Sequence, residues 1–251
     1  MKALITGISG FVGKHLAKHL LEHHYEVAGT TRGESVTVHI GGNPIHVYHC
    51  DFADVASIYR LLTEVNPDVV FHLAGQSNVK KSWENREETF YANVNQTIFL
   101  LDACVKYRQI YPAFRLLTVG SAEEYGKVEP GELPIKEETP LRPMSPYGAS
   151  KAVLSMLIGQ YFKANGLHVI HARPFNHIGP GQRLGFVVPD FASQIAEIER
   201  GNREPVLKVG NLEAVRDFSD VRDIVVAYRL LAEKGEPGEI YNVCSGEGRS
   251  I

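Results

Sequence analysis

The chain has 251 residues, which is enough for one large α/β domain or for one domain with a small appendage. Charged residues make up 22% of it and the formal net charge is −3, so nothing indicates a surface for nucleic acid. No charged and apolar leader opens the chain, no apolar run is long enough to cross a bilayer, and the three cysteines form no closely spaced pair. We therefore expect a soluble cytoplasmic protein with reduced thiols and no membrane partner.

Strand and helix patterns alternate along the first two-thirds of the chain. Apolar runs predict strands at residues 2–5, 26–30, 45–49, 69–73, 115–119 and 168–172. Helical spacing predicts helices at 11–21, 54–65, 87–107 and 146–165, the last opened by a serine cap and a proline and closed by Gly166. This order predicts an α/β fold, a Rossmann-type doubly wound parallel sheet with helices on both faces.

The turn between the first strand and the first helix reads Thr6-Gly7-Ile8-Ser9-Gly10-Phe11-Val12-Gly13. Glycines suit a turn in which backbone passes close to a phosphate and the helix presses against its strand, because a Cβ would obstruct both. Backbone N–H groups at the helix start, with the positive end of the helix dipole, would bind a pyrophosphate. An ordinary glycine turn is the alternative, but its place directly after the first strand favours a dinucleotide site.

Tyr147 and Lys151 lie four residues apart on the helix that begins at Pro146, and therefore on one face of it. An ammonium near a phenol lowers the pKa of the phenol, so the pair is a candidate acid/base. The spacing alone is weak evidence, since chance often produces it. Ser121 strengthens it, because it ends a predicted central strand where open α/β sheets hold ligands. Its hydroxyl would hydrogen-bond a substrate carbonyl, or would simply cap the strand end.

After residue 173 the pattern loosens, because prolines and glycines interrupt it repeatedly. Helices are predicted at 189–200 and 221–232, and strands at 206–209 and 240–243. We expect residues 1–173 to form the dinucleotide-binding domain. Residues 174–251 would contribute to a substrate-binding lobe and return to the sheet.

Several motifs resemble the extended short-chain dehydrogenase/reductase family over essentially the whole chain: Thr6-Gly7-x-x-Gly10-x-x-Gly13, Asp51, Leu73-Ala74-Gly75, Ser121 and Tyr147-x-x-x-Lys151. Within that family, residues 120–126, 142–148, 175–182 and 215–218 are similar to members that modify GDP-sugars. The resemblance implies NADPH-dependent reduction of the C4 keto group of a GDP-4-keto-6-deoxy-D-mannose-type substrate to GDP-D-rhamnose. It also implies a homodimer formed through a helix bundle.

The resemblance implies a role for each site residue. Tyr147 would donate a proton to the C4 keto oxygen, Lys151 would hold the nicotinamide ribose and lower the phenol pKa, and Ser121 would polarise the carbonyl. Asn176 would reach the sugar diphosphate. The remaining cofactor contacts would come from Gly7, Gly10, Phe11, Val12, Asp51, Phe52, Leu73, Ala74 and Gly75.

Two arginines bear on the choice of ligand. The end of the second strand, where NAD-preferring folds place an acid, reads Thr30-Thr31-Arg32. Arg32 would meet the 2′-phosphate of NADP, which favours NADP over NAD; a solvated loop residue is the alternative. Arg216 would hold the phosphates of the GDP-sugar through its two-pronged guanidinium, or would form a surface ion pair with Asp217 or Asp220.

Other activities stay open. Glu123 matches the acid with which 4,6-dehydratases of this family eliminate water, so it is a candidate catalytic residue and GDP-mannose 4,6-dehydration is the nearest alternative. Gly10-Phe11-Val12 and Ala122 depart from the usual dehydratase pattern. A nucleotide-sugar epimerase comes next, and an NADP-binding regulatory subunit is the non-enzymatic alternative, although such proteins often lose the tyrosine or the lysine.

Two further expectations concern a metal and the C-terminal lobe. His15, His19 and His23 follow each other at helical spacing, but no carboxylate is placed to complete a ligand set, so we expect no metal. The chain ends where relatives continue with helices of the sugar-binding lobe. The lobe is therefore expected to be small and truncated.

Overall fold

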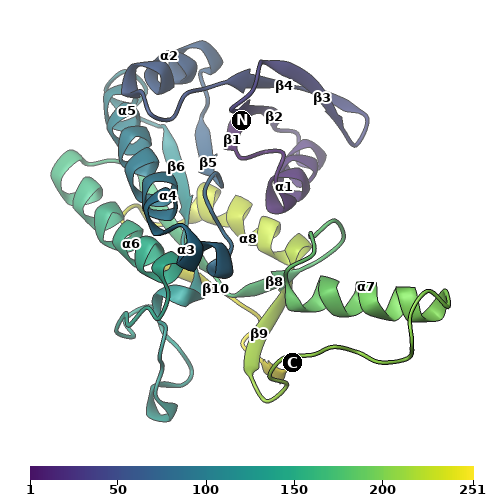
Figure 1. The fold of residues 1–251 in the computed structure, drawn as a ribbon. Helices are drawn as coiled ribbons and strands as arrows, with labels where there is room; N and C mark the ends of the chain where they lie inside the picture. Colours follow the sequence, from purple (N-terminus) through teal and green to yellow (C-terminus); the bar gives the residue numbers. More distant parts are fainter.

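The computed structural model describes residues 1–251, whose centre is an eight-stranded sheet with the strand order β10-β7-β6-β5-β1-β2-β4-β3 (Figure 1). All neighbouring pairs are parallel except β3 and β4. The strands are β1 (Lys2–Thr6), β2 (Glu26–Thr31), β3 (Val36–Ile40), β4 (Asn43–His49), β5 (Val69–His72), β6 (Arg115–Val119), β7 (Val169–Pro174) and β10 (Ile240–Val243).

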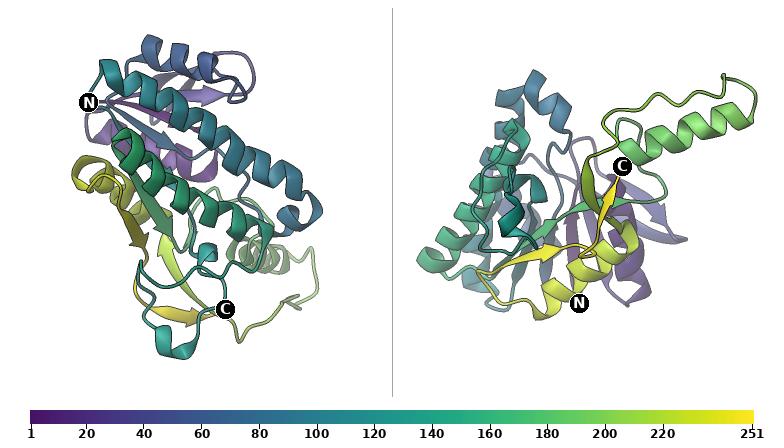
Figure 2. Two further views of the ribbon diagram at one scale, coloured as in Figure 1. Left: turned by 90° about the vertical axis from the view of Figure 1, so that its left-hand side faces the viewer. Right: turned by 90° about the horizontal axis from the view of Figure 1, so that it is seen from below.

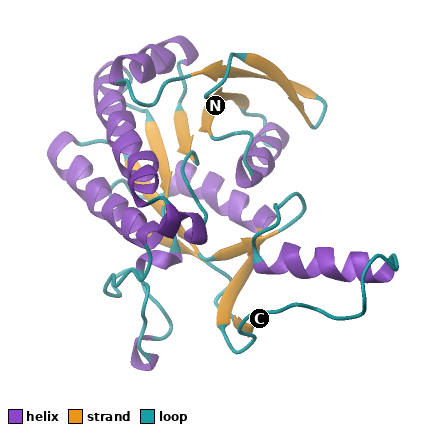
Figure 3. Cartoon of the chain, viewed as in Figure 1, coloured by secondary structure: helices purple, strands orange, loops and turns teal.

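Helices cover both faces of this sheet (Figure 3). On one face, α1 (Phe11–Glu22) packs on β1 and β2 and α8 (Val221–Lys234) packs on β6 and β7. The two helices contact each other and close one apolar core. On the other face, α2 (Val55–Val65), α5 (Gln96–Ile110) and α6 (Pro146–Asn165) close a second core. The expected doubly wound fold is confirmed, and it brings the carboxyl ends of the central parallel strands to one edge.

Local sequence explains why α6, which carries the tyrosine and the lysine, begins and ends where it does. The Ser145 hydroxyl accepts a hydrogen bond from the Gly148 backbone N–H at 3.0 Å, and Pro146 fills the first helical position, where no N–H is needed. Gly166 ends the helix in the left-handed conformation with φ of 63°. The predicted bounds of this helix are confirmed.

The long helix expected at 87–107 is interrupted. The chain forms α3 (Val79–Glu84) and α4 (Arg86–Phe90), passes through a π-helical turn at Tyr91–Asn95, and only then enters α5. The extra residue in the π turn shifts the register, so the buried side near the sheet edge is polar, with Thr89, Asn93 and Thr97. The expected apolar stripe through Phe90 and Val94 is only half-buried.

The structure corrects two further expectations. The missed strand β3 pairs with β4 through a hairpin at Gly41 and Gly42, both with positive φ, which is the glycine pair that tight hairpin turns require. The strand expected at 206–209 does not form. Instead a second sheet of order β11-β9-β8 contains β8 (Asn176–Ile178), β9 (Val215–Asp220) and β11 (Gly248–Ser250).

The α7 helix (Val187–Glu199) and the segment that follows it project from the body of the molecule (Figure 2, right). No residue of α7 is buried. Two 3₁₀ turns, Ala122–Glu124 and Pro130–Glu132, lie in the connection between β6 and α6. No helix of the protein has both the length and the apolar character that a membrane crossing requires.

Candidate active site

The glycine turn after β1 is packed too tightly for side chains. Gly7 has φ of 73°, and a Cβ there would come within 3.0 Å of the Ala74 backbone nitrogen. A Cβ on Gly13 would overlap the Gly7 carbonyl oxygen and lie 2.8 Å from the Ile8 Cα. Gly10 caps α1 without any side-chain hydrogen bond, so the first N–H groups of the helix remain available to an anion. This geometry fits a dinucleotide diphosphate.

The Leu73-Ala74-Gly75 segment lies beside this turn, at the end of β5. The Thr6 hydroxyl accepts a hydrogen bond from the Ala74 N–H at 3.1 Å and lies 2.9 Å from the Nδ1 atom of His72. The Nε2 atom of His72 is 3.0 Å from the Thr97 hydroxyl. Burial lowers the pKa of His72 to about 3, with the positive charge of Lys151 acting in the same direction. A neutral histidine in β5 therefore joins β1 to α5 next to the glycine turn.

The residues expected to hold the adenosine end lie at the neighbouring strand ends. Arg32, directly after β2, is exposed and forms no ion pair. Asp51 is exposed, and its carboxylate accepts a hydrogen bond from the Ala53 N–H at 2.8 Å, so it also shapes its own turn. Phe52 is buried and stacks on the His72 ring, with centroids 6.2 Å apart. The side chains of Arg32 and Asp51 are thus free to contact a ligand.

Tyr147 and Lys151 are both nearly buried, with 8% and 9% of their surfaces exposed, although one is a phenol and the other an ammonium. The Lys151 Nζ donates a hydrogen bond to the Val119 carbonyl at 2.7 Å and lies 5.9 Å from the Tyr147 ring centroid. One of the three ammonium donors is therefore used by the end of β6, and two remain.

The pKa values of this pair differ from the expectation. Burial raises the pKa of Tyr147 to about 12, with the Ser121 hydroxyl opposing the rise and the carboxylates of Glu124 and Glu123 adding to it. Burial lowers the pKa of Lys151 to about 8, against the attraction of Glu124. The expected lowering of the phenol pKa by the ammonium is not observed, because desolvation dominates and the ammonium is directed at the Val119 carbonyl.

Ser121 combines the two roles considered for it. Its hydroxyl accepts a hydrogen bond from the Glu123 N–H at 3.2 Å and caps the short turn Ala122–Glu124. The same hydroxyl is close enough to Tyr147 to affect the pKa of the phenol. The half-buried Glu123 carboxylate makes no hydrogen bond or ion pair. Ser121, Glu123 and Tyr147 therefore meet at the edge of the sheet, with Lys151 beneath them.

Sequence reasoning missed Asn93, a buried polar residue of the π turn. Its Oδ1 accepts a hydrogen bond from the Gln76 N–H at 2.8 Å, and its Nδ2 donates to the Ser150 hydroxyl at 2.9 Å. Ser150 in turn donates to the Tyr147 carbonyl at 2.7 Å. Asn93 thus ties the segment after Gly75 to the helix that carries the tyrosine. An asparagine within an otherwise apolar helical pattern was the available signal.

The two residues expected to bind substrate belong to the second sheet. Asn176 in β8 and Arg216 in β9 are both exposed. The Arg216 guanidinium donates only to the carbonyl of its neighbour Val215, at 2.8 Å. The alternative ion pair is not observed: Asp220 pairs with Arg222 at 2.6 Å, and the Asp217 carboxylate accepts hydrogen bonds from Ser245 and the Gly246 N–H.

The three histidines of α1 have separate partners. The Nε2 atom of His15 is 2.9 Å from the Pro180 carbonyl, and the Nε2 atom of His19 is 3.0 Å from the Arg229 guanidinium. The Nδ1 atom of His23 is 2.9 Å from the His19 carbonyl. No group of three or more histidine, cysteine or acidic side chains could hold a metal ion.

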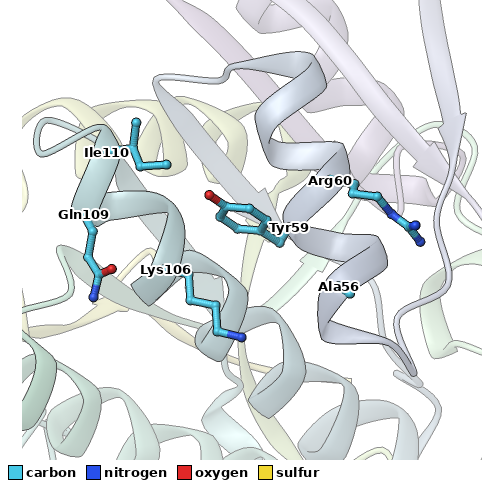
Figure 4. A pocket seen from close by; sticks show the side chains of 6 residues that line it. All are labelled: Ala56, Tyr59, Arg60, Lys106, Gln109 and Ile110. Atoms are coloured by element: carbon cyan, nitrogen blue, oxygen red, sulfur yellow. The ribbon is translucent and has the colours of Figure 1, made fainter.

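A shallow hollow elsewhere on the surface is unrelated to these residues. It lies between α2 and α5, and Figure 4 shows its lining of Ala56, Tyr59, Arg60, Lys106, Gln109 and Ile110. None of the residues described above lines the hollow. The strand-end edge thus remains the candidate site.

A glycine turn that fits a diphosphate follows β1, and a tyrosine–lysine pair lies near the end of β6, at the same edge of a doubly wound sheet. This combination defines a nucleotide-dependent enzyme of the extended short-chain dehydrogenase/reductase class. The family model described as GDP-mannose 4,6 dehydratase matches residues 4–251, and the chain belongs to this family.

Individual relatives agree with this assignment. The chain is 39% identical to GDP-6-deoxy-D-mannose reductase of Pseudomonas aeruginosa, over all of this chain and 76% of the relative. It is 34% identical to human GDP-mannose 4,6 dehydratase, over 99% of this chain and 69% of the relative. The solved structure of RMD from Pseudomonas aeruginosa complexed with NADPH matches with a TM-score of 0.84 and 35% identity, covering 99% of this chain and 78% of that one.

Proposed function

We propose that this protein reduces the C4 keto group of a GDP-4-keto-6-deoxy-D-mannose-type nucleotide sugar with NADPH and forms GDP-D-rhamnose. One observation carries the proposal: the phenol of Tyr147 is buried and held beside Ser121 at the edge where this fold binds ligands. Such a phenol keeps its proton at neutral pH, and reduction of a ketone needs a proton donor. The 39% identity to a GDP-6-deoxy-D-mannose reductase supplies the substrate class.

The three side chains Tyr147, Ser121 and Lys151 then divide the work of the reaction. Bound NADPH supplies the hydride. The Tyr147 hydroxyl donates a proton to the keto oxygen, and the Ser121 hydroxyl donates a second hydrogen bond to the same oxygen. The Lys151 ammonium, with two donors unused by Val119, stabilises the phenolate left on Tyr147 and hydrogen-bonds the ribose.

The cofactor would lie across the ends of β1, β2 and β5. The N–H groups of Phe11 and Val12 would bind the diphosphate, because Gly10 leaves them without a side-chain cap. Asp51 and Phe52 would contact the adenine. The exposed, unpaired Arg32 favours NADP through the 2′-phosphate, with NAD as the alternative.

The substrate diphosphate would lie against the second sheet. Its binding groups would be Asn176 and Arg216, and the unpaired guanidinium of Arg216 suits two phosphate oxygens. Under this proposal, residues 1–173 form the cofactor half of the molecule and residues 174–251 the substrate half.

The test is a single-turnover assay with NADPH and GDP-4-keto-6-deoxymannose. We expect stoichiometric loss of NADPH absorbance and one new nucleotide sugar, identified by NMR as GDP-D-rhamnose. Tight NADPH binding without turnover of any keto sugar would instead indicate a regulatory subunit and contradict the proposal.

Dehydration of GDP-mannose is the second candidate, and the Glu123 carboxylate favours it. This group makes no hydrogen bond or ion pair and lies near Tyr147, so it is available as an acid or a base. Turnover of GDP-mannose without net consumption of NADPH would select this activity. Human GDP-mannose 4,6 dehydratase is 34% identical to the chain.

We also propose that the protein is a cytoplasmic homodimer. Apolar side chains are exposed on the side of the molecule formed by α3, α4 and α6: Trp83, Tyr91, Met144 and Met156. A second copy would cover them through a helix bundle. Light scattering should give twice the mass of one chain, and Met156→Glu should reduce that mass to one chain. The three free cysteines suit a reducing compartment.

A further inference from the structure

A fully buried polar cluster lies directly beneath the candidate site, formed by residues that the chemistry described above does not use. Its centre is Glu124, whose Oε2 accepts a hydrogen bond from Arg173 Nε at 2.9 Å and another from the Ser155 hydroxyl. The Oε1 atom lies 3.4 Å from His171 Nε2. Arg173 also donates to Ser155 at 3.0 Å and to the Tyr125 hydroxyl at 2.6 Å. We call these five residues the Glu124 cluster.

This cluster connects the parts of the molecule that carry the reacting side chains. The Oε1 of Glu124 accepts a hydrogen bond from the Ser121 N–H at 2.9 Å. Ser155 lies on α6, one helical turn after Lys151. The carboxylate also packs against Gly120, where any Cβ would overlap it. Glu124 therefore joins the end of β6 to α6 and, through Arg173, to β7.

The charge of the cluster is fixed by its surroundings. Burial alone would raise the pKa of the Glu124 carboxyl, but hydrogen bonds and charge from His171 and Arg173 hold it below its ordinary value. Replacement of such a pair by apolar residues often costs little stability, so stability alone does not explain its presence under a catalytic strand end.

We propose that Glu124 is a positioning residue for the reduction, which holds the end of β6 at Ser121 in register with α6. Its carboxylate also favours the charged form of the Lys151 ammonium on that helix. This inference rests on the proposed function. The groups near the ammonium are Tyr147 on α6, His72 on β5 and Glu124 on the turn after β6. Glu124 itself pairs with His171 and Arg173 on β7. Of the groups near the ammonium, Glu124 is the one that favours the charged lysine.

The test is Glu124→Gln, which keeps the shape of the side chain and removes its charge. Loss of the negative charge lowers the pKa of both Lys151 and Tyr147, so the alkaline limb of kcat/KM for NADPH-dependent reduction should move to lower pH by about one unit. Glu124→Asp keeps the charge but is shorter, so kcat should fall while the limb stays in place. Glu132→Gln is the control, because it breaks the Glu132–Arg142 pair, which lies away from the site. It should change neither kcat nor the alkaline limb of kcat/KM.

A second readout separates this inference from the proposed function. The pKa of Lys151 can be followed by NMR of protein labelled at lysine Cε, with the Lys151 signal assigned through Lys151→Arg. In Glu124→Gln this pKa should fall by the same amount as the alkaline limb, whether or not any substrate is turned over. If wild type reduces no keto sugar, the proposed function fails, and the NMR titration still decides the role of Glu124.

If Glu124→Gln does not fold, Glu124→Gln/Arg173→Gln removes both charges and avoids an unpaired buried guanidinium. In this double variant the pKa of Lys151 should lie below that of wild type. It should lie above that of Glu124→Gln where both variants can be measured. An unchanged Lys151 titration in whichever of these variants folds overturns the proposal and leaves Glu124 a purely structural residue.

Discussion

The two halves of the candidate site are built in opposite ways. Tyr147 and Lys151 are less than one-tenth exposed and belong to a helix that packs against the sheet. Asn176 and Arg216 are exposed, and the neighbouring α7 contributes no buried residue (Figures 1 and 2). The proton-transfer groups are therefore positioned by the core, whereas the candidate substrate groups lie on a surface that packing constrains little.

This difference predicts where substitutions act. A change in the buried half should alter the chemical step, cofactor binding or the pH dependence of folding. A change in the exposed half should alter substrate affinity and leave the rest intact.

Tyr147→Phe should have the largest effect, because it removes the proton donor and keeps the ring. We expect kcat for keto-sugar reduction to fall about 10²–10⁴-fold. Tyr161→Phe is the matched control on the same helix. It loses one hydrogen bond to Asp102, at 2.6 Å, and should keep wild-type turnover. A Tyr147→Phe enzyme with nearly the wild-type rate would remove Tyr147 from the mechanism.

His72→Gln should change the response of stability to acid. The folded-state pKa of His72, about 3, lies below its unfolded value of 6.5, so the neutral form contributes stability that is present above pH 6.5 and is lost as pH falls toward 3. Between these pH values, the free energy of unfolding measured in urea should change more steeply with pH in wild type than in His72→Gln. The difference in slope should be about 1.4 kcal/mol per pH unit. The exposed His46→Gln should retain the wild-type slope; equal slopes for His72→Gln and wild type would contradict the assignment.

Gly13→Val should weaken NADPH binding, because its side chain would overlap the Gly7 carbonyl and displace the helix start from the turn. A fluorescence titration should show that the binding free energy of NADPH falls by about 1.4 kcal/mol or more, which is at least a tenfold loss of affinity. Gly159→Ala lies in α6 with open space around it, so it should stabilise the helix by about 1 kcal/mol and leave NADPH affinity unchanged. Equal affinities for all three proteins would show that the turn does not hold the cofactor.

Arg216→Gln should have the smallest effect of the four and should sharpen the contrast between the halves. We expect KM for the GDP-sugar to rise several-fold, which corresponds to about 1 kcal/mol of binding free energy. The kcat value and the NADPH affinity should stay unchanged. Arg222→Gln, which breaks the Asp220 pair on the adjacent surface, is the matched control and should leave KM unchanged. A drop in kcat for Arg216→Gln without a change in KM would place this arginine in the chemical step.

Features that depend on neighbouring residues were predictable from the sequence. The glycine turn, the Ser145 cap and the Gly166 end of α6 are set within a few residues, and the structure has all three. Features that depend on distant residues were not. Glu124 and Arg173 are 49 positions apart, and nothing in their local sequence shows that both are buried. The π turn at Tyr91–Asn95 shifts the register of its helix, and the spacing of apolar residues in the sequence does not indicate that shift.

The wrong expectations have physical causes as well. Residues 206–209 form a short, mainly apolar run typical of a strand, yet Val206, Leu207 and Val209 are exposed and no neighbouring strand pairs with them. The Tyr147 pKa was expected to fall because sequence spacing indicates the ammonium but not the depth of burial. Desolvation and strand pairing are tertiary effects, and sequence periodicity does not report them.

The most direct test of the proposed reduction traces the hydrogen that is transferred from NADPH to the sugar. Wild-type protein is mixed with NADPH deuterated at the transferable position of nicotinamide C4 and with GDP-4-keto-6-deoxymannose in ordinary water, and the product is analysed by NMR. We expect one deuterium on C4 of the sugar for each NADPH consumed. A product without deuterium at C4, or intact NADPH after complete conversion of the sugar, would contradict it.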